Sequence, residues 1–398
     1  MSNAIFGNLA LQGTLPVDPN WGKEQETKTY CQDNSSKIFS DESEMLVFID
    51  EREANAEWIE EVELKDLNLA LLDNALLSTA GDLREEIVRD TRKNTGLVLQ
   101  GSIPQTALRT CAIPSLLERA RISGAALGKV ATDVFRDILN ECFNVANPKA
   151  TGKVRIADGK VSAVRSSNYV PLPLPMVLST ASEYIHNRFP LNQFAGGYWD
   201  HSITSAEWAL TGELSLINTY LTALKKHGIA HEEIQPGIRV TSSDIGESGV
   251  NIVPKLVVGK DCLMLPLGGP VGVAHKGEAN MERVYENIQA VFALYSERIA
   301  DLTALLDIEI AFPANCMRGV LKRWGIPKKY ADPTVEVFGR GFAEGESCTA
   351  HDLFYGLGEL LMQVQINNAN GETSLKMEEA IAKALTLDFA EYDVPEAK

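Results

Sequence analysis

The chain has 398 residues, of which 45% are hydrophobic and 23% charged, and its formal net charge is −17 at pH 7. This length and composition suit two or three globular domains with their own cores. The negative charge excludes a protein that binds nucleic acid or anionic membranes over its whole surface. No apolar run reaches the roughly 18 residues of a membrane span, and the first residues lack the pattern of a secretory signal. We therefore expect a protein of the cytoplasm.

The cysteines and histidines form no metal-binding or disulfide pattern. The six cysteines contain no CxxC pair, and only His227 and His231 lie close together among the six histidines. A structural zinc site requires clustered Cys and His ligands. We therefore expect reduced, mostly buried thiols and no metal or other cofactor.

Charge is segregated along the sequence. Residues 41–66 contain eleven acidic side chains and only two basic ones, whereas residues 315–330 contain no acid. The second stretch combines basic with aromatic residues, a combination typical of nucleic-acid-binding surfaces. Its candidate binding residues are Arg318, Lys322, Arg323, Trp324, Lys328, Lys329 and Tyr330.

The first 150 residues divide into an arm and an acidic region. Residues 1–40 are rich in Gly, Asn, Ser, Thr and Asp, which is typical of a loosely ordered arm, either a partly disordered terminus or a segment exchanged between protomers. The apolar run 45–50 predicts a strand. From residue 57 to 94 the apolar spacing is mainly helical, so residues 41–150 are expected to be mainly helical.

The clearest hairpin signal is Asp158-Gly159, which lies between two runs of alternating apolar residues. Four polar positions of these runs, Lys153, Arg155, Lys160 and Arg165, are basic. The two-residue period of a strand places Lys153 and Arg155 on one face of the sheet. That face is either a solvated edge or an anion-binding surface that contacts nucleic acid.

Two further strands are predicted near residues 250–258 and 262–266, separated by Gly259-Lys260, which favours antiparallel pairing. A glycine-rich corner follows them and leads to a histidine. Residues 280–308 then carry apolar side chains at helical spacing, which predicts one long helix suited to packing or to oligomer formation.

These patterns predict an α+β fold with a mixed or antiparallel central sheet flanked by helices. The sheet is expected to combine the hairpin near 153–165 with the strands near 237–266. The predicted divisions are the arm 1–40, the acidic region 41–150, an α+β core 151–279 and a helical C-terminal region 280–398.

Several short motifs between residues 100 and 300 follow one another in a recognisable order. They are an Ile-Pro element before a helix, a Ser-x-x-Tyr after the hairpin, a Ser-Ser-Asp-x-Gly turn, and a cysteine-containing strand that leads to a histidine. Their residues are Ile113, Pro114, Ser166, Tyr169, Ser243, Asp244, Gly246, Cys262, His275 and Gly277.

In this order the motifs resemble a phage- and plasmid-borne family catalogued as domain of unknown function 932. The chain departs from that family at 242–244, where Ser-Ser-Asp replaces an asparagine-serine pair, and at 265–273, where LPLGGPVGV replaces a cysteine-threonine-asparagine-glycine corner. The family carries no agreed activity. The resemblance implies a phage, prophage or plasmid protein in a bacterial cytoplasm, near DNA metabolism or host-defence genes.

Three classes of function are compatible with the sequence. The first is an accessory protein that binds or anneals single-stranded DNA, with the basic residues on phosphates and Trp324 or Tyr330 stacked on bases. The structural alternative for this stretch is a solvated basic face with Trp324 in the core. The second class is a protein-binding inhibitor of host defence, or an assembly factor, whose acidic segment 41–66 occupies a basic site on a host or phage protein.

The third class is an enzyme whose site is assembled from separated residues. No nucleophile elbow, phosphate loop or metal quartet occurs in the sequence, so a non-enzymatic role is favoured. The long helix and the arm lead us to expect a homo-oligomer. The candidate residues of a dispersed site are Asp200, His201, Asp244, His275 and His351.

Overall fold

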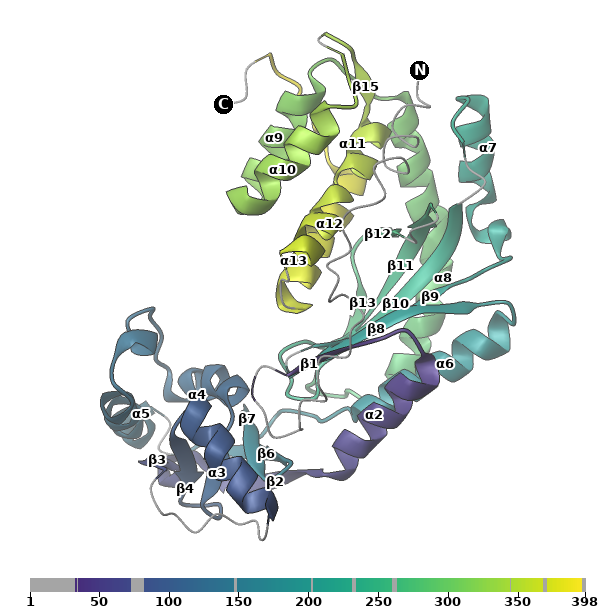
Figure 1. Cartoon of the computed structure of the whole chain (residues 1–398). Helices are drawn as coiled ribbons and strands as arrows, with labels where there is room; N and C mark the ends of the chain where they lie inside the picture. Colours follow the sequence, from purple (N-terminus) through teal and green to yellow (C-terminus); the bar gives the residue numbers. More distant parts are fainter. Residues whose placement is uncertain are drawn as a thin grey trace.

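The computed structural model of the chain describes residues 33, 35–72, 82–146, 149–201, 203–230, 234–259, 263–343, 345–367 and 371–395. Within these residues the chain forms two lobes, each built around its own sheet (Figure 1). Helices flank both sheets, and most neighbouring strands are antiparallel. The fold is therefore α+β, as the sequence predicted.

The first lobe, residues 56–166, contains a mixed six-stranded sheet among its described residues. Strands β5 and β7 pair in parallel, and the other neighbours are antiparallel. Its strands in spatial order are β2 (Ala56–Glu63), β6 (Thr151–Ala157), β7 (Lys160–Ser166), β5 (Thr106–Leu108), β4 (Leu97–Gln100) and β3 (Asn68–Leu71).

Helices lie on both faces of this sheet. On one face, α4 (Ile113–Ala120) and α5 (Thr132–Ala146) pack with the sheet in one buried apolar cluster. On the other face, α3 (Asp82–Asn94) buries Ile87 against Val98 and Ala107. The lobe thus has its own core.

The second lobe comprises residues 35–54 and 169–395 of the described chain, and every strand pair in its main sheet is antiparallel. A short two-stranded sheet, β14 (Glu309–Ile310) with β15 (Cys348–Thr349), lies outside it. The main sheet contains β1 (Ser36–Phe39), β8 (Gln193–Asp200), β9 (Thr204–Ala209), β10 (Ile234–Ser242), β11 (Val250–Val258) and β12 (Leu263–Pro266), with β13 (Val271–Val273) also on β11.

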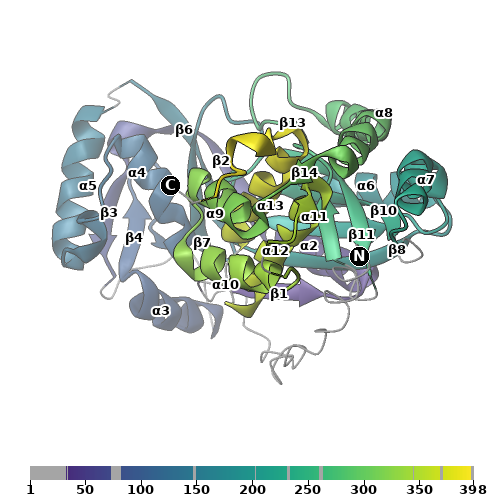
Figure 2. The ribbon, with the colours of Figure 1, turned by 90° about the horizontal axis from the view of Figure 1, so that it is seen from above.

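Two groups of helices pack against this sheet and share one apolar core with it (Figure 2). The first group contains α2 (Glu42–Ala54), α6 (Leu174–Arg188), α7 (Asn218–Lys226) and α8 (Met281–Ala304). The second group contains α9 (Pro313–Arg323), α10 (Lys328–Gly339), α11 (Ala350–Gly356), α12 (Glu359–Ile366) and α13 (Gly371–Lys383).

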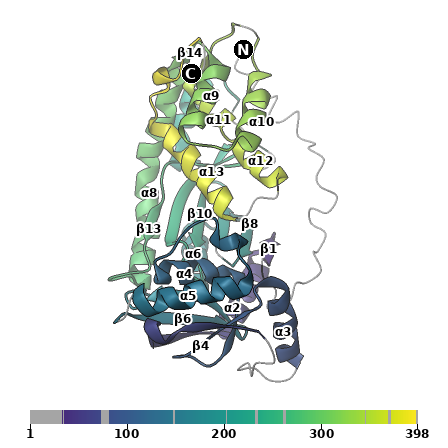
Figure 3. The ribbon, with the colours of Figure 1, turned by 90° about the vertical axis from the view of Figure 1, so that its left-hand side faces the viewer.

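The first lobe is an insertion in the second. The chain enters it at Asn55, directly after α2, and returns through residues 167–173 to α6. Figure 3 shows the first lobe below the second, with these elements at the boundary. Asp33 also contacts Thr110 and Lys160 of the first lobe, whereas β1 lies in the second, so the described chain connects the lobes at three places.

Elements with strong local signals are confirmed. Asp158 and Gly159 adopt φ values of +50° and +72° in the turn between β6 and β7. This is the left-handed backbone that Asp-Gly tolerates in a two-residue hairpin turn. Strands β11 and β12 pair as expected, and α8 is a 24-residue helix that buries the predicted apolar face.

Several sequence predictions are wrong. The run 45–50 is helical, because the Asp41 side chain caps the N-terminus of α2 and Met45 and Ile49 share its buried face. Residues 56–63 form a strand and not a helix, paired with β6. The hairpin near 153–165 and the strands near 237–266 belong to different sheets.

The predicted divisions also differ from the structural units. The boundary at 150 falls inside the first lobe, since α5 and β6 share one core, and the boundary at 279 falls inside the second lobe, since α8 packs on its sheet. Most of the predicted arm, residues 1–32 and 34, lies outside the described residues. Residues 36–39 form strand β1.

Candidate functional site

The motif residues that carry the family resemblance meet at the junction of the two lobes. The Tyr169 ring stacks on His275 with centroids 5.2 Å apart and lies 4.9 Å from the Trp58 ring. The Val170 N–H donates to the His275 carbonyl oxygen at 2.9 Å. Gly246, with φ +76°, lies so close that a Cβ there would be 2.5 Å from the Tyr169 ring. Segments distant in sequence thus form one contact.

Ser166, Ser243 and Gly277 lie in turns near this contact, whereas Ile113 and Pro114 begin α4 of the first lobe. The Ser166 carbonyl accepts the Tyr169 N–H at 3.0 Å, and the Ser243 hydroxyl accepts a backbone N–H within the 243–247 turn at 3.1 Å. Gly277 has φ +66°, which favours glycine. Cys262 lies outside the described residues.

A group of buried charged side chains, which we call the junction cluster, lies beside this contact. Asp158 lies 3.4 Å from Arg52 and 3.2 Å from Arg109, and Asp244 lies 3.7 Å from Arg155 and 4.0 Å from Arg52. These five side chains are at most 6% exposed. The junction cluster consists of Arg52, Arg109, Arg155, Asp158, His201 and Asp244.

Burial and neighbouring charges shift the pKa values of side chains in the junction cluster. Burial lowers the pKa of the Arg52 guanidinium, which also lies 4.0 Å over the Trp199 ring. Burial raises the pKa of Asp158 even though Arg52 and Arg109 attract the carboxylate. His201 Nε2 faces Arg109 Nη1 at 3.3 Å and must accept, because a guanidinium only donates. The cluster is thus a compact ionic contact.

The predicted anion-binding face on the hairpin is paired with carboxylates in the structure. Lys153 pairs with Glu60 at 2.8 Å, and Arg155 pairs with Glu53 at 2.7 Å and belongs to the junction cluster. Arg165 pairs with Glu247 at 2.6 Å. Nearby carboxylates thus compensate all three cations, which leaves little attraction for phosphate.

The basic stretch is exposed. Helices α9 and α10 are joined by a short turn in which Gly325 has φ +66°. We call this unit the basic hairpin. Two acids lie in α10, Asp332 a turn after its first lysine and Glu336, which pairs with Arg340. Its five exposed basic side chains are Arg318, Lys322, Arg323, Lys328 and Lys329.

The N-terminus of α10 has an unusual electrostatic arrangement. No side chain caps it, and no acid lies in its first turn, where Lys328 and Lys329 stand. The N-terminal end of a helix carries partial positive charge and exposed N–H groups. The positive charges of two lysines there repel each other and this end of the helix, and a bound anion would offset the repulsion. This end of α10 therefore suits a phosphate group.

The predicted aromatic stacking surface is not available in the basic hairpin. Tyr330 is 3% exposed, and Lys329 Nζ lies 4.5 Å over its ring. Trp324 is half-buried and packs against the core of the second lobe. The aromatic residues therefore build the hairpin and leave its surface to the cations.

The acidic segment 41–66 is largely used within the molecule. Glu42 accepts the Trp208 indole N–H at 3.0 Å and lies 2.8 Å from His186. Glu44 pairs with Lys37 at 2.8 Å, and two further acids pair with the hairpin cations. A segment engaged in these contacts is poorly suited to fill a basic site on a partner.

The residues of the predicted dispersed enzyme site are only partly brought together, since His275 lies beside the junction cluster and His351 lies elsewhere. His351 is fully buried, with Nε2 2.6 Å from the Tyr220 hydroxyl. Asp200 accepts the Tyr198 O–H at 2.8 Å, whereas His201 and Asp244 belong to the junction cluster. Among the described residues, no group of three or more His, Cys, Asp or Glu side chains could hold a metal ion.

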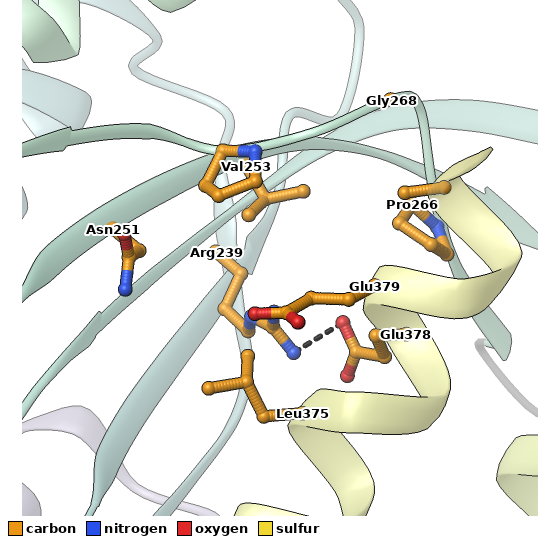
Figure 4. A pocket seen from close by; sticks show the side chains of 10 residues that line it. Arg239, Asn251, Val253, Pro266, Gly268, Leu375, Glu378 and Glu379 are labelled. Carbon is orange, nitrogen blue, oxygen red and sulfur yellow. Dashed lines mark ion pairs between the residues drawn. The ribbon is translucent and has the colours of Figure 1, made fainter. Parts of the chain in front are cut away.

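A small pocket lies between the main sheet of the second lobe and α13 (Figure 4). Arg239 pairs with Glu378 beside it, and Glu378 also lies 2.5 Å from Lys255, whose side chain is fully buried. Leu375 and Glu379 complete its helix side. These ion pairs attach α13 to the sheet.

The sequence and the structure were compared with known proteins. No family model, curated protein or solved structure gave a significant match. In the part of the chain that the structure describes, no helix is both long and apolar enough to cross a membrane. The family resemblance of the motifs therefore stays a prediction.

Proposed function

We propose that this chain is an accessory protein of DNA metabolism that binds the phosphate backbone of nucleic acid through the basic hairpin. The observation that carries the proposal is the exposure of five cations on one short unit of a chain whose net charge is −17. The uncapped N-terminus of α10 beside Lys328 and Lys329 adds N–H donors to these cations. Together they form a local polyanion-binding surface.

The burial of the two aromatic residues supports one kind of contact. Because Tyr330 is buried and Trp324 packs on the core, base stacking contributes little and phosphate contacts dominate. Binding of this kind is insensitive to base sequence and depends steeply on salt, because each neutralised phosphate releases counterions. The phage and plasmid setting implied by the motifs supports single-stranded DNA as the natural ligand.

The proposal is tested by fluorescence anisotropy with a labelled single strand and a labelled duplex at two salt concentrations. We expect binding at low salt that weakens as salt rises. The triple variant Arg323→Ala, Lys328→Ala, Lys329→Ala should bind more than about tenfold more weakly at low salt. The slope of the logarithm of the binding constant against the logarithm of the salt concentration should be smaller in magnitude by roughly 2 to 3, since each lysine or arginine contributes about one unit.

A matched control removes three exposed cations from the first lobe, Arg92→Ala, Lys93→Ala and Lys129→Ala. This variant has the same net charge as the test variant, so it separates a local site from a general charge effect. It should bind like the wild type. Absence of binding at low salt, or equal losses in both variants, would contradict the proposal.

A further inference from the structure

We propose that the junction cluster is an orientation lock, which holds the two lobes in one relative arrangement and whose loss lets them separate while each stays folded. The first observation is that the apolar cores do not cross the junction. Each apolar cluster of buried residues lies wholly within one lobe. Apolar burial therefore mainly stabilises each lobe by itself, and across the junction it adds the Trp58–Tyr169 ring contact.

The second observation is that the ion pairs do cross. Arg52, from α2 of the second lobe, contacts Asp158 of the first lobe, and Arg155 of the first lobe contacts Asp244 of the second. Arg109 of the first lobe reaches His201 of the second. Each arginine of the cluster thus has a partner across the junction.

Further contacts at the rim have the same polar character. The Arg165 guanidinium donates from the first lobe to the Ile245 carbonyl at 2.8 Å and pairs with Glu247 of the second lobe. Directional contacts of this kind are satisfied in one orientation only. They fix a geometry more than they add stability, which is the best-attested role of buried ion pairs.

Removal of one carboxylate from the cluster should therefore let the two lobes move apart. Three arginines remain in a buried site with less negative charge, and a guanidinium cannot lose its proton. The arginines recover hydration when the lobes part. Outside the cluster, that movement is resisted by the chain connections, by the Asp33 and Arg165 contacts and by the Trp58–Tyr169 ring contact. Unfolding of either core is not required.

The test uses small-angle X-ray scattering on the full chain with Asp158→Asn and, separately, Asp244→Asn. Asn-Gly suits the left-handed turn that Asp158 occupies, so the first variant keeps its hairpin. We expect the radius of gyration to rise by roughly 10% from the approximately 21 Å of a compact chain of this length. Hydrogen exchange should accelerate at the junction segments 167–173 and 243–249, with the strands of both sheets still protected.

Glu378→Gln is the matched control. Glu378 is also a buried carboxylate with two cationic partners, Arg239 and Lys255, but all three belong to the second lobe. This variant should keep the wild-type scattering curve. The proposal would be overturned if both junction variants gave the wild-type scattering curve. It would also be overturned if hydrogen exchange accelerated throughout either core.

Discussion

His351 is the residue that most clearly couples folding to pH. Its side chain is fully buried, and its Nε2 lies 2.6 Å from the Tyr220 hydroxyl, which contacts the Tyr355 hydroxyl at 2.7 Å. Burial lowers the pKa of His351 to about 3. The imidazole is therefore neutral in the folded chain at every pH above that value.

This shift predicts acid sensitivity. An unfolded histidine takes up a proton below about pH 6.5, whereas folded His351 does not, so its contribution is full above pH 6.5 and declines as pH falls toward 3. Between pH 7 and 5 the wild type should lose about 2 kcal/mol of unfolding free energy from this group. Urea titrations at both pH values should show a smaller loss in His351→Gln, and an equal loss would contradict the assignment.

At the residue scale, Gly246 is constrained by its backbone angle and by the nearby Tyr169 ring. Gly246→Ala should destabilise the chain by about 2 to 4 kcal/mol, because it adds strain at φ +76° and a clash with the Tyr169 ring. Gly259→Ala is the control, since Gly259 has φ +72° with open space around it, and should cost only about 1 kcal/mol. Thermal unfolding of both variants measures the difference, and equal losses would show that the ring relaxes freely.

At the scale of single elements, α11 depends on its first turn. Thr349 Oγ1 accepts the Asp352 N–H at 3.2 Å, while the Asp352 carboxylate accepts the Thr349 N–H at 2.9 Å. The helix that follows is buried, so water cannot replace these bonds. Thr349→Ala should therefore cost about 1 to 2 kcal/mol of unfolding free energy, and Thr349→Ser should cost much less. Chemical denaturation of both variants checks this, and identical losses would point to the lost methyl group.

Elements with a complete local signal were predictable from the sequence. The Asp158-Gly159 turn, the long helix α8 and the Thr349 cap each depend on neighbouring residues. Strand β2 was not predictable, because its spacing fits a helix and only pairing with β6, ninety residues later, selects the extended form. The division into two sheets is likewise decided by long-range pairing.

The candidate site, too, could be predicted only in part, because some of its features depend on contacts between distant segments. The basic character of the hairpin follows from the sequence, since residues 315–330 contain five cations and no acid. The burial of Tyr330 does not follow, because it depends on packing within the C-terminal helices. Arg52 had one available signal, as a rare cation within the acidic stretch 41–66. Its partner Asp158 was assigned only to a turn.

At the scale of the whole molecule, the distribution of charge matters more than its sum. Acids of the segment 41–66 pair with first-lobe cations such as Lys153 and Arg155, which reduces the attraction of that face for an anion. The basic hairpin lies in the C-terminal helices and has no comparable acidic neighbour in sequence. A polyanion is therefore expected to approach the second lobe at this hairpin, against the field of an otherwise acidic chain.

The insertion of the first lobe has a consequence for synthesis on the ribosome. Strand β1 pairs with β8, and the ribosome makes the entire first lobe between them. At about 5 to 20 residues per second, β1 and α2 wait roughly ten seconds or longer for their partner. The first lobe is continuous in sequence and can complete its core within that interval. Phe39, Met45 and Ile49, which are buried in the finished protein, stay uncovered until α6 and β8 emerge.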